Sequence, residues 1–273
     1  MKTRTVIFLA ILLGLFTYTL PLYAADKEYH LEEKTIIDIP VVGKISTMTT
    51  SYLANCKLKE MTTIKLHNAL VQMMSESDGK SHDNQLTDMC EELLWNYNDE
   101  TRVYTAQSFS DIRAGIEADR ENSETHIDME SDQNDMDDLP RIIREMMGSE
   151  KNVNGFKAQK VLTTVYPKDS ESRIIIEEYY TNKSKALSKI SSAREDLNKK
   201  LGHDDSHIEG VPSLINMAYE AIKADRDWSR PDGEVIKFII RLLDEDDDEM
   251  FTMSYNVTTA EIISFQEDHF ALN

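Results

Sequence analysis

Cysteine is nearly absent from this chain of 273 residues, and glycine and proline are scarce: the sequence has two Cys, nine Gly and six Pro. Two cysteines exclude a disulfide-dense miniprotein and any zinc or iron–sulfur site made of cysteines alone. So few glycines also give little support for a nucleotide-binding loop, in which the backbone approaches phosphate closely. Basic residues are in the minority, with 30 Lys and Arg against 50 Asp and Glu. The formal charge of −20 disfavours a nucleic-acid-binding protein, because such a surface repels phosphate.

Recognisable catalytic and cofactor-binding motifs are missing as well. The chain contains no G-x-S-x-G, G-x-x-x-x-G-K, H-E-x-x-H or G-x-G-x-x-G sequence. The segment from His203 to His207 offers two imidazoles and two carboxylates, but it follows Gly202, where Asp and Ser are ordinary turn residues. We therefore expect no catalytic residues, no metal and no cofactor, and we interpret the chain as a protein without enzymatic activity.

The N-terminus has the pattern of a secretory signal peptide. Lys2 and Arg4 precede an apolar stretch from Val6 to Leu20, and Ala24 offers a small residue for cleavage. The stretch is short for a helix that crosses a bilayer, and no later apolar run is as long. We predict a signal peptide over residues 1–24 and export to the periplasm or out of the cell. Residues 25–273 are then expected to form a single domain without a membrane span.

Export would place Cys56 and Cys90 in an oxidising compartment, where an even number of cysteines permits one disulfide. Their spacing in the sequence does not show whether the two side chains meet. Neither cysteine belongs to a Cys-x-x-Cys pair or has a histidine close by in the sequence, so neither is expected to be a catalytic thiol.

The first part of the mature chain favours extended structure, because residues 27–107 are rich in Thr, Val, Ile and Tyr and nearly lack Gly and Pro. The pattern predicts strands over Tyr29–Ile39, Lys44–Ala54 and Lys57 to about Met74, the last of which is ambiguous with a helix. The clearest hairpin joins Glu92–Tyr97 to Arg102–Gln107 across a polar turn.

Two helices and an acidic segment are predicted next. A short helix begins at Ser108, and residues 117–138 are so acidic that we expect a mobile loop. A second helix is predicted from Pro140 to about Gly148. Its apolar stripe consists of Ile142, Ile143, Met146 and Met147.

The second half of the chain repeats the alternation of strands with grouped helices. Strands are predicted over Gly155–Tyr166, Arg173–Thr181, Glu234–Leu243 and Met250–Ser264. Helices are predicted from Asn182 to Gly202 and over Pro212–Asp227. Neighbouring strands that look antiparallel, with helices inserted in groups, indicate the α+β class.

Three segments resemble uncharacterised exported bacterial proteins that are related to the periplasmic lipoprotein carriers (LolA/LolB-like). They are DMCEELLWNYNDETRVYTAQSFSDIR, which contains Asp88, Trp95 and Tyr104, then VNGFKAQKVLTTVYPKDSESRIIIEEYYTNK, and the region Phe265–Phe270. The resemblance implies a curved antiparallel sheet, half-barrel-like, with helices packed on or in its concave face. The acidic insertion, the additional helices after Asn182 and the lack of the carriers' basic features depart from that pattern.

The resemblance leads to two hypotheses for the function. In the first, the chain is an exported binding protein that holds a lipid, an acyl chain or a lipidated partner in an apolar hollow. Its ligand-binding residues would be Trp95 and Tyr104 on the sheet, and Ile142, Ile143, Met146 and Met147 on a helix that covers the hollow. In the second, the chain is a protein–protein interaction module of the cell envelope, and its own helices fill the hollow.

Overall fold

The computed structural model describes residues 27–40, 43–67, 80–98, 101–124, 140–168, 170–202 and 231–272. Several predictions lie outside the described residues: the signal peptide at 1–24, the cluster His203–His207, the helix over Pro212–Asp227 and the acidic segment beyond residue 124.

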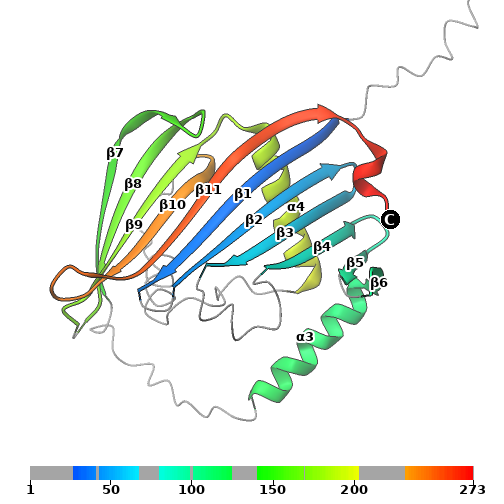
Figure 1. The fold of residues 1–273 in the computed structure, drawn as a ribbon, viewed down its shortest axis with the longest axis horizontal. Coiled ribbons are helices and arrows are strands. Elements are labelled where there is room, and N and C mark those ends of the chain that lie inside the picture. The colour runs from blue at the N-terminus through cyan, green and yellow to red at the C-terminus, as the bar shows by residue number, and fades with distance from the viewer. Residues whose placement is uncertain are drawn as a thin grey trace, which may run out of the picture.

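All the described strands belong to one sheet, in which each strand is antiparallel to its neighbours. The first meander consists of β1 (Lys27–Ile39), β2 (Gly43–Ala54), β3 (Lys57–Leu66), β4 (Lys80–Asp88), β5 (Leu93–Asn98) and β6 (Val103–Ser108). The second consists of β7 (Arg141–Val153), β8 (Phe156–Tyr166), β9 (Arg173–Thr181), β10 (Glu234–Leu243) and β11 (Glu249–Ser264). The order across the sheet is β6-β5-β4-β3-β2-β1-β11-β10-β9-β8-β7. The first and last strands therefore lie side by side at its centre (Figure 1).

Tight turns explain why consecutive strands pair. Asn154 and Gly155 connect β7 to β8 with φ angles of 52° and 86°. Two successive positive φ angles give a turn whose twist matches that of the flanking strands, and Asn followed by Gly is the sequence that adopts it most readily. Asn55, with a φ of 53°, plays a similar part between β2 and β3.

Helix α4 (Lys185–Leu201) packs against β1, β2, β10 and β11 on the concave face of the sheet (Figure 1). Ser184 caps its start, where the side-chain oxygen accepts a hydrogen bond from the Leu187 N–H at 3.2 Å. Gly202 ends it with a φ of 75°, as predicted from the sequence. The α+β class and the half-barrel-like sheet with a helix on its concave face are thus confirmed.

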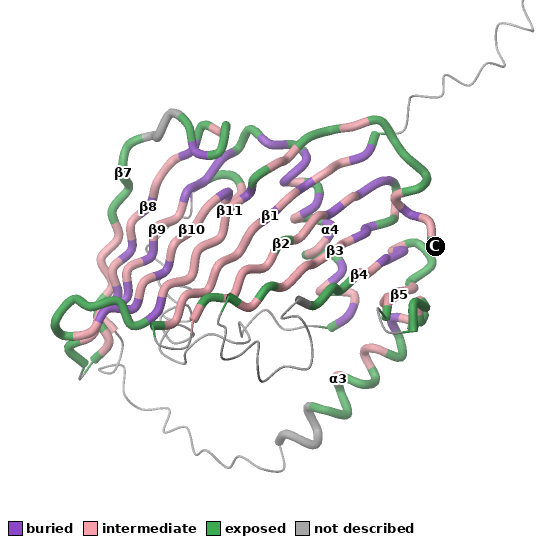
Figure 2. Tube along the Cα trace, in the orientation of Figure 1, coloured by how far each residue is buried: buried purple, intermediate pink, exposed green. Residues whose placement is uncertain are grey.

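One apolar cluster joins α4 to the sheet. The inward residues of the helix are Ala186, Leu187, Ile190, Ala193, Leu197 and Leu201. They face Leu31, Leu53 and Val257, all of which are buried. Figure 2 shows buried stretches along α4 and the strands in front of it, whereas much of α3 and the loops is exposed. Burial of this helix stripe is the main source of its stability, since an isolated helix of this length is marginal in water.

Most strands lie where the sequence pattern predicts them, but β4 was missed. Its sequence, KSHDNQLTD, has almost no apolar residues, so periodicity gave no signal. In the structure β4 pairs with β3 along its whole length and with β5 over Asn84–Asp88. Backbone hydrogen bonds to two neighbours hold this polar strand in place, with Leu86 and Thr87 buried near its end.

The helix predicted from Pro140 to Gly148 is wrong, because this segment forms the edge strand β7. Residues from Arg141 to Met147 pair regularly with β8. Ile142 lies opposite Val165 and packs into a second apolar cluster of the sheet, formed around Val165, Ile174 and Phe251. Apolar pairs at a spacing of four fit one face of a helix, but in a strand Ile142 and Ile143 point to opposite faces. Tertiary pairing decides between the two patterns.

Helix α3 (Phe109–Glu124) is longer than predicted, so the acidic segment begins as a helix at residues 117–124 and not as a loop. Ser108 caps the start of the helix: its Oγ accepts from the Asp111 N–H at 3.2 Å and donates to the Asp111 carboxylate at 2.6 Å. Phe109 is fully buried, which anchors the start of the helix against the main cluster.

Candidate functional site

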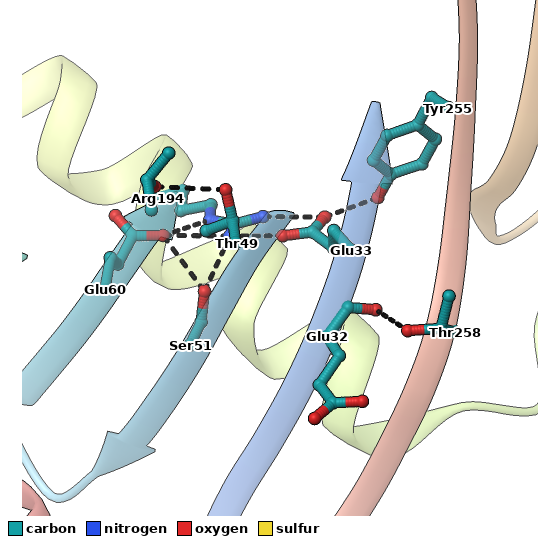
Figure 3. A network of polar contacts seen from close by, with 9 residues as sticks. Glu32, Glu33, Thr49, Ser51, Glu60, Arg194, Tyr255 and Thr258 are labelled. Carbon is teal, nitrogen blue, oxygen red and sulfur yellow. Dashed lines mark hydrogen bonds and ion pairs between the residues drawn. The ribbon is translucent and has the colours of Figure 1, made fainter. Parts of the chain in front are cut away.

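Arg194 projects from the middle of α4 toward the sheet and binds three strands at once (Figure 3). Its Nη1 and Nη2 atoms donate to the two carboxylate oxygens of Glu33 on β1, at 3.1 and 2.5 Å. Nε donates to Glu60 on β3 at 2.9 Å, and Nη2 donates to the Ser51 hydroxyl on β2 at 2.9 Å. The planar guanidinium suits this arrangement, because it presents several donors in a fixed fork.

Strand alternation brings these polar groups to the concave face. Glu33 follows Leu31 by two residues on β1, so both side chains point toward α4. Ser51 lies directly opposite Leu31 in the β1–β2 pair and opposite Glu60 in the β2–β3 pair. The network therefore lies on the concave face between the apolar cluster under α4 and a polar part of the sheet.

The network is shielded from solvent and strongly coupled. The Glu33 side chain is 9 % exposed, the Arg194 side chain 28 %, and Ser51 is fully buried. Burial by itself would lower the pKa of Arg194, but the hydrogen bonds and negative charges of Glu33 and Glu60 outweigh it and raise that pKa above its ordinary value. Arg194 is therefore a permanent cation at this position.

Tyr255 on β11 extends the network by donating its phenolic hydrogen bond to Glu33. Burial, the negative charge of Glu33 and this hydrogen bond all raise the pKa of Tyr255 far above its usual range. The phenol is consequently fixed as a hydrogen-bond donor at any physiological pH.

A polar cavity of about 290 Å³ adjoins the network. Every residue that lines it is polar: Glu33, Glu60, Asp83 and Arg194 supply charges, and threonines, Gln85 and Tyr255 supply the rest. Three carboxylates face one guanidinium, so the cavity favours a group that donates hydrogen bonds or carries a positive charge.

A second cavity of about 430 Å³ shares Glu60, Gln85 and Arg194 with the first, and the two therefore form one groove beside α4. Its other walls are partly apolar. The apolar residues are Leu94 from β5, Ile112 from α3, and Leu197 and Leu201 from α4. The groove thus has a polar end and an end with apolar walls.

The convex face carries a different cluster, in which the C-terminal segment docks on the sheet. Glu28 is fully buried there and binds His269 Nδ1 at 2.5 Å and the Gln266 N–H at 3.0 Å. Tyr52 stacks on one side against His269 and on the other against His30, with ring centroids 4.1 and 4.9 Å apart. Burial and the charges of Glu28 and Glu32 raise the pKa of Tyr52.

The predicted ligand-binding residues Trp95 and Tyr104 lie on this convex face. Trp95 packs with Leu86 and with Phe270 of the C-terminal 3-10 helix η2 (Glu267–Phe270). The Tyr104 hydroxyl accepts a hydrogen bond from Lys59 Nζ at 3.4 Å. The structure therefore places both aromatic residues on the side of the sheet away from α4 and its groove.

The other four predicted residues lie at the opposite edge of the sheet, on β7. Ile142 is partly buried in the second apolar cluster, whereas Met146 and Met147 are 54 % and 41 % exposed. Ile143 lies opposite Thr164, on the other face of the strand from Ile142. The structure does not bring these four residues together with Trp95 and Tyr104, and a ligand-binding role for the six stays a prediction.

Cys56 and Cys90 form a disulfide, with their Cα atoms 5.6 Å apart. The bond links the β2–β3 turn to the β4–β5 turn, where the Met89 N–H also donates to the Cys56 carbonyl at 2.9 Å. It lines a third cavity of about 540 Å³, together with Phe265 and Phe270 of the C-terminal segment.

The network around Arg194 was not predicted from the sequence. Two signals were available. Arg194 follows Ala193, which lies on the apolar face of α4, and Glu33 follows Leu31 at a spacing of two on β1. A charge on a buried face usually has a partner, but which partner is a question of tertiary structure.

Within the described ranges, no helix is both long and apolar enough to cross a membrane. The same parts of the chain contain no group of three His, Cys, Asp or Glu side chains arranged to hold a metal ion.

No protein-family model matches the chain, and no curated protein matches it in sequence. Solved structures with similarity to it include a Vibrio parahaemolyticus domain assigned to outer membrane lipoprotein sorting, at 9% identity and a TM-score of 0.26, covering 89% of this chain and 88% of that one. A DUF1329 family protein from Desulfovibrio piger is similar at 10% identity and a TM-score of 0.24, with 91% of both chains covered. The chain is likewise similar to a LolA superfamily protein from Nitrosomonas europaea, at 7% identity and a TM-score of 0.25, with 91% of both chains covered.

Proposed function

We propose that the protein is an exported, non-catalytic binding protein that holds an amphiphilic ligand in the groove beside α4. The observation that carries the proposal is the polarity of the two adjoining cavities, one wholly polar and one with partly apolar walls. Their volumes of about 290 and 430 Å³ are those of ordinary small-molecule sites.

The ligand that fits this groove has a polar group and an apolar chain. Glu60, Asp83 and Gln85 would receive hydroxyl or amine donors of the polar group, in a cavity where carboxylates outnumber the guanidinium. Leu94, Ile112 and Leu197 would contact an acyl or alkyl chain, whose burial contributes about 0.8 kcal/mol per methylene. A lipid or the acyl chain of a lipidated partner combines both features.

Catalysis is not part of the proposal, because the network is arranged to keep its protons. Glu33 and Glu60 raise the pKa of Arg194 against the effect of burial, and burial and Glu33 raise the pKa of Tyr255, so neither gives up a proton near neutral pH. A general acid or base works best when its pKa is near the working pH. The network is better suited to fixing α4 on the sheet and to shaping the polar end of the groove.

Two features support export. The N-terminal pattern predicts a signal peptide at residues 1–24. The disulfide between Cys56 and Cys90 requires an oxidising compartment to form and persist, as the periplasm and the cell exterior provide.

The test starts from protein purified from its own compartment, analysed by native mass spectrometry and by lipid extraction. A stoichiometric amphiphile is expected, and a fluorescent monoacylglycerol, whose hydroxyl groups can donate to the carboxylates of the polar cavity, should compete with it for the groove. Gln107 lines the second cavity from β6, so Gln107→Trp should block it and weaken probe binding by about tenfold or more. Ala106 is exposed on the other face of the same strand, which makes Ala106→Trp the matched control. Absence of bound amphiphile together with probe binding that is insensitive to Gln107→Trp would contradict the proposal.

A second candidate is the interaction module of the cell envelope, and the position of α4 favours it. This helix fills the concavity in front of β1, β2, β10 and β11, where a larger hollow would otherwise lie. On this alternative, extraction yields no amphiphile and a pull-down yields one protein partner in stoichiometric amount.

A further inference from the structure

The edge strand β7 has an unusual combination of length, exposure and charge. It is the terminal strand of the sheet and extends over 13 residues, whereas the opposite edge strand β6 has only six. In Figure 1, β7 lies at the outer end of the sheet with no described element beyond it. One side of its backbone is therefore available to pair with a further strand.

Only part of β7 is regular enough to accept a partner. Its pairing with β8 has register shifts between Met147 and Ser149 and again between Glu150 and Val153. Such bulges interrupt a ladder and commonly protect exposed edges from pairing. The regular part consists of Arg141–Met147, preceded by Pro140.

Exposed apolar side chains lie on this same part. Met146 and Met147 are 54 % and 41 % exposed and point to opposite faces of the strand. An edge strand with exposed apolar residues on both faces is a favourable site for adding a strand.

We propose that β7 pairs with β7 of a second copy of this chain, antiparallel and about a two-fold axis at Ile143. In this register Arg141 of each copy lies opposite Glu145 of the other, so the contact contains two equivalent ion pairs. Both side chains are exposed on the convex face. Opposite charges placed directly across neighbouring strands stabilise the pairing, and like charges oppose it.

The charges on β7 favour this pairing register over the registers shifted by one or two residues. In an antiparallel pair of strands, two residues directly opposite each other point to the same face of the sheet. A two-fold axis perpendicular to the sheet must therefore pass beside one residue of β7 and its copy, and never between two consecutive residues. An axis at Arg144 would oppose two arginines, and an axis at Glu145 would oppose two glutamates. An axis at Ile142 would place Arg141 opposite Ile143 and form no ion pair. Among the residues of the regular part Arg141–Met147, only the axis at Ile143 pairs opposite charges.

The interface is isologous, which is the usual form of a two-fold homodimer. It would join two sheets of eleven strands into one continuous sheet. It uses no residue of the groove, so it is independent of the proposed ligand-binding function.

Charge reversal tests the pairing on the full mature chain, by analytical ultracentrifugation. The wild-type protein is expected to form dimers. Arg141→Glu and Glu145→Arg each turn both ion pairs into repulsive contacts and should weaken dimerisation by about tenfold or more. Lys65→Glu, at an exposed position of β3, is the matched control and should leave the dimer unchanged.

Two combinations make the test specific. An equimolar mixture of the Arg141→Glu and Glu145→Arg proteins should form heterodimers, because each then offers the complement of the other. The double variant Arg141→Glu/Glu145→Arg should dimerise with itself again. Circular dichroism of each variant verifies that it is folded. A monomeric wild-type protein, or a dimer that neither single reversal weakens, would overturn the proposal.

Discussion

Arg194 on α4 and Glu33 on β1 lie 161 positions apart in the sequence and form a bidentate ion pair in the concavity of the sheet. The pair joins the helix to the central strands, and Tyr255 and Glu60 complete its hydrogen bonds. A buried charge of this kind contributes specificity of position more than stability, yet it is costly to leave without its partner.

Replacing Arg194 by methionine should destabilise the protein by about 3 kcal/mol, because Glu33 would remain buried without its counter-charge. Urea unfolding followed by circular dichroism measures the change in the free energy of unfolding. Lys199→Met is the control on the same helix, since Lys199 forms an exposed pair with Glu195 that is screened by solvent and contributes little to stability. Equal effects of the two substitutions would show that the network around Arg194 has no special structural role.

The raised pKa of Tyr255 makes a prediction about alkaline pH. In the unfolded chain the phenol ionises near pH 10, whereas in the folded protein it keeps its proton at that pH. The folded state then binds more protons, so this contribution to stability is complete below about pH 10 and is lost as the pH rises further. Wild-type stability should therefore fall more steeply between about pH 9 and 11 than that of Tyr255→Phe.

The measurement is urea unfolding at several alkaline pH values, compared between the two proteins. Tyr255→Phe should also be less stable at neutral pH by about 1–2 kcal/mol, because Glu33 loses a hydrogen bond. Tyr166→Phe serves as the control, since the Tyr166 side chain is 37 % exposed. Parallel pH profiles of wild type and Tyr255→Phe would contradict the assignment.

Removing the disulfide should cost about 3 kcal/mol of stability. Cys56 and Cys90 are separated by 34 positions, and a crosslink over a loop of this length restricts the unfolded chain considerably. The Cys56→Ser/Cys90→Ser variant, compared with the oxidised wild type in urea, measures the effect. Reducing agent should destabilise the wild type but leave the double variant unchanged. A wild-type protein that is insensitive to reduction would argue that the bond contributes little.

The docking of the C-terminal segment should depend on Glu28. Glu28→Gln removes the charge that binds His269 and weakens the acceptor for the Gln266 N–H. Hydrogen exchange of residues 265–272 should accelerate by roughly fivefold to thirtyfold, equivalent to about 1–2 kcal/mol of local stability. Asp268→Asn, an exposed change within η2, is the matched control. Unchanged exchange in Glu28→Gln would mean that Phe270 alone anchors the segment.

Local sequence signals predicted a large part of the fold. The alternation of β8, β9 and β10, the helix start at Ser108 and the stop at Gly202 all depend on residues near one another in the chain. Such signals work because side-chain direction repeats every two residues in a strand and every 3.6 in a helix. The polar strand β4 and the edge strand β7 escaped them, since one has no apolar pattern and the other has a pattern that fits both structures.

The sequence by itself determined the class of the fold, most of its strands and the apolar stripe of α4. Only the tertiary structure decided which residues share a site. Glu33, Glu60 and Arg194 meet because β1 and β3 lie two strands apart under one helix, whereas Trp95 and Met146 lie at opposite edges of the sheet. Periodicity assigns a side chain to a face of its own element, but the order and pairing of the strands determine which faces come together.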